Sequence, residues 1–150
     1  MQTLHFTTHI NAPREKVWHT MLDDATYRQW TKAFNAGSYY EGSWEEGSKI
    51  LFVGDDEDGK QSGMVSRIAV SRKPEYVSIE HMGVMMDGKE MMDDPNFKEW
   101  KGAHENYTFD EKDGGTQLTV DLDVTDGMAP EMAGMWEKAL VALKELCEKA

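Results

Sequence analysis

Hydrophobic and polar residues alternate near the start of the chain. Over residues 3–10, Leu4, Phe6 and Ile10 share one side of an extended segment, and histidines and threonines fill most of the other positions. A period of two residues is typical of a strand with one buried face. We therefore predict a first strand over residues 3–10.

The period then changes to that of a helix. Asn11 can cap a helix, and Pro13 fits a first helical turn. Asp23 or Asp24 can cap a second short helix that reaches Trp30. Four apolar residues lie at helical spacing in the first of these helices: Val17, Trp18, Met21 and Leu22. The pattern predicts two short helices after the first strand.

Between residues 38 and 124 the pattern is again that of strands. Turn-forming residues at 45–47, 55–59, 73–75 and 113–115 separate the extended segments. Six more strands are predicted, over residues 38–44, 49–54, 64–72, 76–82, 105–110 and 116–124. The last is the most regular, because each apolar residue from Leu118 to Val124 is followed or preceded by a polar one.

The C-terminal segment returns to helical spacing. Asp126 and Pro130 are start signals, and an apolar stripe recurs every three or four residues at Met132, Trp136, Ala139, Leu143 and Leu146. The chain therefore has an α+β pattern. A curved antiparallel sheet of about seven strands, wrapped around the long C-terminal helix, would bury both apolar faces. We expect this shape to leave room for a cavity between sheet and helix.

Length and charge limit the number of domains and the kinds of partner that the chain can have. A chain of 150 residues predicts a single domain over residues 1–150. Its net charge of -12 disfavours nucleic acid as a partner, and its apolar runs are too short to span a membrane. No secretory signal is visible at the start, so we expect a cytoplasmic protein. Cys147 has no second cysteine to pair with, and we expect it to pack as a small apolar residue.

Several short motifs together resemble those of a known superfamily. They are Ile10-Asn11-Ala12-Pro13 with Val17-Trp18, a later Trp30, the Trp44/Gly47 hairpin, Tyr107-Thr108-Phe109, and the run from Gly114 to Val120. In order and spacing the chain resembles the SRPBCC (START-like, helix-grip) superfamily. Within it the chain is most similar to the small bacterial branch grouped with homologues of the activator of the 90-kDa heat-shock chaperone ATPase. The resemblance implies a sheet that grips the last helix around a deep apolar cavity; members bind lipids, sterols or polyketides, and a few are cyclases.

The candidate site residues come from the faces that should line such a cavity. On the predicted strands, aromatic rings and polar groups occupy the alternate positions that should point inward. The C-terminal helix adds two methionines and a tryptophan. A tryptophan from the connection before residue 105 is added as a possible cover. The predicted ligand-binding residues are Tyr40, Trp44, Ile79, His81, Trp100, Glu105, Tyr107, Met132, Met135 and Trp136.

Metal and cofactor motifs are not found in the sequence. His5 and His9 lie four residues apart on a strand, too far to share one metal ion. An EF-hand frame over residues 54–65 would place Gly54 and Val65 where calcium needs carboxylates. Neither GxxxxGK[ST] nor GxGxxG occurs, and no serine lies in a GxSxG elbow. We expect no cofactor, no metal and no catalytic nucleophile.

The segment from Gly83 to Glu105 is long for a connection in a compact domain. It holds four of the chain's 11 methionines within eight residues, together with Phe97 and Trp100. Asp94 and Pro95 could begin a short helix with one apolar face. Two interpretations remain open: a lid over the open end of the sheet, or a loop that packs its own small core.

Three functions follow from these observations. The first is noncatalytic binding of a small hydrophobic or amphipathic molecule between the sheet and the last helix. The second, implied by the resemblance, is an interaction module for a chaperone. The third is a cyclase or hydrolase that uses His81 with Glu105 or Tyr107. The protein itself would be a monomer or a homodimer.

Overall fold

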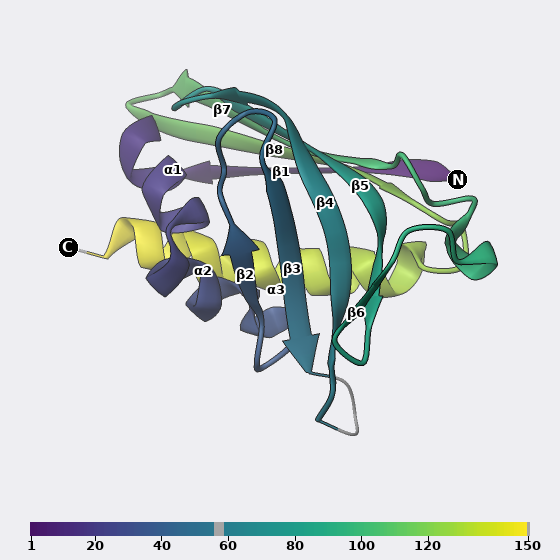
Figure 1. Cartoon of the computed structure of the whole chain (residues 1–150). Coiled ribbons are helices and arrows are strands. Elements are labelled where there is room, and N and C mark those ends of the chain that lie inside the picture. Colours follow the sequence, from purple (N-terminus) through teal and green to yellow (C-terminus); the bar gives the residue numbers. More distant parts are fainter. Residues whose placement is uncertain (56–58, 150) are drawn as a thin grey trace.

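The computed structural model describes residues 1–55 and 59–149, except for the side chain of Asn96. It has an α+β helix-grip fold, in which a curved antiparallel sheet bends over one long helix (Figure 1). In chain order the elements are β1 (Gln2–Ile10), α1 (Arg14–Leu22), α2 (Asp24–Trp30), η1 (Thr31–Ala33), β2 (Tyr39–Gly42), β3 (Lys49–Asp55), β4 (Gln61–Arg72), β5 (Tyr76–Met86), β6 (Lys89–Met91), η2 (Pro95–Phe97), β7 (His104–Lys112), β8 (Gly115–Val124) and α3 (Ala129–Glu148).

The sheet has the order β1-β8-β7-β5-β4-β3-β2, and the short β6 pairs with β5. All of these pairs are antiparallel. The first half of β5, Tyr76 to Glu80, pairs with β7, whereas its last residues, Val84 to Met86, pair with β6. The two partners of β5 therefore separate near His81, and the segment between β6 and β7 lies between them.

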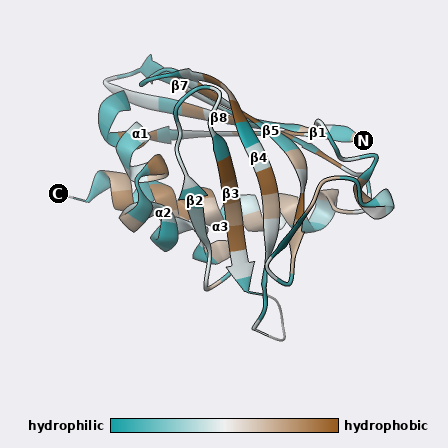
Figure 2. Ribbon diagram, viewed as in Figure 1, coloured by the Kyte–Doolittle hydropathy of each residue, from teal (hydrophilic) through white to brown (hydrophobic). Residues whose placement is uncertain are grey.

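The strands predicted from alternation at β1 and β8 are confirmed. Phe6 lies opposite Val120 and Leu4 opposite Leu122, so the apolar residues of both strands share one face. Val120 is fully buried and Leu122 is 2% exposed. This face packs on α3, where Trp136, Ala139 and Leu143 of the predicted stripe are buried. Figure 2 shows hydrophobic residues also on the central strands β3 and β4.

Two glycines mark the ends of strands. Asp113 and Gly114 both have positive φ, at 50° and 77°, as a two-residue hairpin between β7 and β8 requires. At Gly42, φ is 124° and a Cβ would lie 2.4 Å from the Lys49 carbonyl oxygen. The pattern had predicted that this strand would continue to Trp44. β2 instead ends at Gly42, where the backbone has this positive φ.

Other boundaries also differ from the prediction. Pro13 is the N-cap of α1, in an extended conformation, and no side chain caps this end. Instead, the Asn11 backbone N–H donates to Glu148 Oε2 at 2.9 Å and so ties the start of α1 to the end of α3. β4 begins at Gln61 and β5 continues to Met86. The predicted turn at 55–59 lies in part outside the described residues.

Helix lengths and composition bear on a membrane location. Among the described residues, none of the helices is long and apolar enough to cross a bilayer.

Candidate functional site

A cavity of about 280 Å³ lies between the sheet and the N-terminal half of α3. Its wall comes from α2 and η1 on one side, β3, β4 and β7 on another, and α3 on the third. The described residues that line it are mostly aromatic or methionine: Tyr27, Trp30, Phe34, Phe52, Tyr107 and Trp136, with Met64, Met128, Met132 and Met135. Apolar walls with a few polar groups are the usual make-up of a small-molecule site.

Two glycines in this wall have neighbours too close for a side chain. Gly54 and Gly63 lie in the paired strands β3 and β4, and both line the cavity. A Cβ at Gly63 would lie 1.8 Å from the Phe52 carbonyl oxygen, and a Cβ at Gly54 would lie 2.9 Å from the Asn35 side chain. Side chains are therefore excluded from these two positions of the wall by close backbone and side-chain neighbours.

One carboxyl group stands in this wall. Glu105, on β7, is 8% exposed, and its Oε2 accepts a hydrogen bond from the Tyr107 hydroxyl. Its Oε1 lies 3.6 Å from His81 Nε2, an ion pair only when the imidazole is protonated. Burial, reinforced by the charge of Glu105, raises the pKa of the Tyr107 and Tyr27 phenols, so both keep their protons at neutral pH.

His81 continues this polar chain away from the cavity. Its Nδ1 lies 2.8 Å from Ser66 Oγ, and both residues are 1% exposed. A proton on Nε2, directed toward Glu105, leaves Nδ1 to accept from the Ser66 hydroxyl. A serine, a histidine and a glutamate thus lie in sequence, and the first two are buried.

Trp100 covers the far side of His81. The two rings stack with centroids 4.7 Å apart and an interplanar angle of 14°. Trp100, Val84 and Ala103 form a small separate core, against which Met64 and Phe97 pack. The predicted short helix is reduced to η2, Pro95–Phe97. This part of the segment therefore forms its own small core, and through Met64 that core adjoins the cavity.

The residues predicted for the site fall into two groups. Five of the ten line the cavity: Glu105, Tyr107, Met132, Met135 and Trp136. The other five pack behind its wall: Tyr40, Trp44, Ile79, His81 and Trp100. Strand parity and helix spacing brought the first group together. The second group lies where other elements already cover its side chains.

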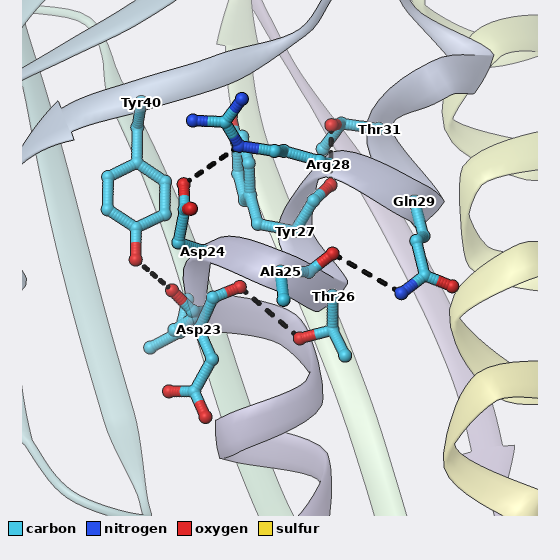
Figure 3. Close-up of polar contacts among 10 residues, drawn as sticks. Asp23, Asp24, Ala25, Thr26, Tyr27, Arg28, Gln29, Thr31 and Tyr40 are labelled. Carbon is cyan, nitrogen blue, oxygen red and sulfur yellow. Dashed lines mark hydrogen bonds and ion pairs between the residues drawn. The ribbon is translucent and has the colours of Figure 1, made fainter.

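Tyr40 and Trp44 show how this happens. The Tyr40 ring lies 5.0 Å from that of Tyr27 and 5.5 Å from that of Trp44, centroid to centroid. Its hydroxyl donates to the Leu22 carbonyl oxygen at 2.6 Å, at the junction of α1 and α2 (Figure 3). The pair therefore holds α2 against the β2–β3 hairpin and supports Tyr27 from behind.

Four lining rings were missed from the sequence: Tyr27, Trp30, Phe34 and Phe52. The first three are spaced three and four residues apart, a spacing that places them on one helical face. Trp30 is fixed by a hydrogen bond from its Nε1 to the Met21 carbonyl oxygen at 3.0 Å. The spacing was thus available in the sequence, but which side of the two short helices met the cavity was not.

A second, larger hollow of about 470 Å³ lies beside β5 and β6. Its lining mixes three methionines with charged residues, namely Asp93, Asp94, Lys98 and Lys101. We assign the candidate site to the inner cavity, because its wall is more apolar and has one buried carboxyl group. Among residues 1–55 and 59–149, no group of three or more potential ligands is placed to hold a metal ion.

Comparisons with known proteins extend over nearly the whole chain. Residues 11–148 match the family described as Activator of Hsp90 ATPase homolog 1-like protein. No curated protein matches the chain. Among solved structures, the Aha1 dimer from Colwellia psychrerythraea has a TM-score of 0.71 at 19% identity, with 99% of this chain and 97% of that chain covered.

Two further structures show the same arrangement. An AHSA1-like protein from Aeromonas hydrophila has a TM-score of 0.69 at 18% identity, over 96% of this chain and 90% of that one. CalU16 from Micromonospora echinospora has a TM-score of 0.66 at 17% identity, over 97% and 75%. At these identities the likeness establishes the fold.

Proposed function

The chain belongs to the Activator of Hsp90 ATPase homolog 1-like family, and on this basis we propose that it binds a small hydrophobic or amphipathic molecule without catalysis. The ligand would lie between the curved sheet and α3, within one domain over residues 1–150. The observation that carries the proposal is the cavity of about 280 Å³ with its apolar wall and a single carboxyl group among the described lining residues. At roughly 30 Å³ per water molecule, the space equals about nine waters.

The depth of burial supports binding over chemistry. His81, the candidate acid or base, is 1% exposed and covered by Trp100. A reacting group must come within about 3 Å of its proton donor or acceptor. Glu105 does border the cavity, but its partners are a neutral phenol and a histidine that has no access to the space.

A cavity-filling variant tests the proposal. Met132→Phe places a larger side chain into the wall, whereas Val141→Phe makes a comparable change at a site on α3 that is 58% exposed. With 1-hexanol as probe, we expect a rise in Tm for the native protein and for Val141→Phe, and none for Met132→Phe. Native mass spectrometry of freshly purified protein would show any molecule carried from the cell. Equal responses of the two variants would reject binding in this cavity.

A second candidate function is interaction with a chaperone. It is favoured by the family description and by the net charge of -12, which suits a partner with a basic surface. The measurement is the ATP turnover of the chaperone from the same cell with and without this protein. An unchanged turnover, with no co-purification at low salt, would reject it. Light scattering in the same buffers would distinguish a monomer from a homodimer.

A further inference from the structure

The charge of the cavity is unusual for a space lined mainly by apolar groups. Glu105 is the one ionisable carboxyl or amino group among the described lining residues. Of the described residues, only His81 lies within ion-pairing distance of its carboxyl oxygens. Because Tyr27 and Tyr107 keep their protons, Glu105 is the acidic group of the described wall that can carry a charge.

Glu105 also has unused capacity as an acceptor. A carboxylate offers about four lone-pair positions. The Tyr107 hydroxyl takes one of them on Oε2, and the 3.6 Å to His81 Nε2 exceeds a hydrogen-bond distance. Among the described residues this carboxyl group thus has few donors, and a positive group placed beside a buried carboxylate stabilises it.

Six aromatic side chains line the same cavity as this carboxylate. The ring of Trp136 has three neighbours that also line the cavity: Phe34 at 5.1 Å, Trp30 at 5.8 Å and Tyr107 at 5.9 Å between centroids. Their planes are inclined to that of Trp136 by 42° to 68°. The rings are therefore inclined to one another and do not form a flat stack. The face of an aromatic ring is negative and attracts a cation, and cages of aromatic rings hold quaternary ammonium groups.

We propose that the cavity selects a small organic cation, an alkyl or aryl ammonium, with its positive nitrogen beside Glu105 and among the rings around Trp136. The inference rests on the proposed function and specifies its ligand class. The apolar part of the ligand would lie against the methionines of the wall, whose flexible side chains adapt to different shapes. The net charge of -12 would also raise the local concentration of cations.

Three probes of matched size test the assignment by calorimetry. They are phenyltrimethylammonium, its neutral isostere tert-butylbenzene, and the anion phenylacetate. We expect the cation to bind at least tenfold more tightly than the isostere, and the anion to bind more weakly than the isostere. Glu105→Gln, which keeps an acceptor for the Tyr107 hydroxyl, should reduce the preference for the cation to near unity. Glu137→Gln removes the same charge from the exposed face of α3 and should leave the preference unchanged.

The outcomes distinguish two claims, that the cavity binds a small molecule and that it selects a cation. If the isostere binds as tightly as the cation, the selection of cations is rejected and binding of apolar molecules stands. If none of the three probes binds or displaces 1-hexanol, both are rejected. If Glu105→Gln does not fold, as judged by circular dichroism, the ranking of the three probes on the native protein decides alone. Retention of the full preference by a folded Glu105→Gln would also overturn the role of this carboxylate.

Discussion

The two halves of α3 face the same curved sheet but are packed differently. In the C-terminal half, Ala139, Leu143 and Cys147 are fully buried in the main core. In the N-terminal half, Met132 and Met135 are only partly buried and border the cavity. One helix thus contributes a filled core at one end and the wall of a hollow at the other.

The difference comes from what lies on each half. α1 lies near the C-terminal end of α3 (Figure 1), and Lys16 Nζ donates to the Lys149 carbonyl oxygen at 2.9 Å. Buried Val17 and Met21 of α1 belong to the same core as Leu143. The other half borders the cavity, which is also lined by rings of α2 and by Phe34, packed edge to face, and by glycines of β3 and β4. The rings of this half leave a space beside Met132 and Met135.

The largest expected effect is in the filled half. Leu143→Ala should lower the free energy of unfolding by about 4 kcal/mol, because the surrounding core cannot collapse into the gap. Met132→Ala, in the hollow half, should cost about 1 kcal/mol, because the side chain already borders empty space. Urea unfolding of both variants measures the contrast. Equal losses would mean that the two halves are packed alike.

The small core beside the cavity should show an intermediate effect. Trp100→Ala should cost about 3 kcal/mol and expose the imidazole of His81, because the stacked ring is removed. Modification of His81 by diethyl pyrocarbonate, followed by mass spectrometry, measures that exposure. Phe97→Ala, at the edge of the same core, is the control and should leave His81 protected. A protected His81 in Trp100→Ala would mean that another group covers it.

A smaller effect is expected behind the cavity wall. Tyr40→Phe should lower the free energy of unfolding by about 1 kcal/mol, since it removes the hydrogen bond to the Leu22 carbonyl oxygen and keeps the ring. Binding of the 1-hexanol probe should be unchanged, because Tyr40 does not line the cavity. A variant of normal stability that no longer binds would place Tyr40 in contact with the ligand instead.

The smallest expected effect is a pH dependence in the filled half. Burial raises the pKa of the Cys147 thiol from 9.0 to about 11. The folded state therefore holds this proton more tightly than the unfolded chain, and the associated stability is present below pH 9 and lost as the pH rises toward 11. Between about pH 8 and about pH 10, the native protein should lose more stability than Cys147→Ala. Parallel curves for the two proteins would exclude this contribution.

The sequence determined much of the fold. Alternation in β1 and β8, the helical stripe of α3, the two short helices and the glycine turn at 113–115 follow local rules of spacing and backbone conformation. Contacts along one strand or helix repeat at a fixed period, so a single sequence reveals them. The short β6 was missed, because three residues are too few for any period to be visible.

The site was only half determined in this way. Alternation along the strand predicted that Glu105 and Tyr107 share one face of β7. Helical spacing predicted Met132 and Trp136 on α3. Parity gave His81 equally well, but the chain after β6 folds back and places Trp100 over it. Which inward residues meet a space and which meet another ring depends on how far each element reaches across the sheet. That is a property of packing between distant segments, and only the tertiary structure decided it.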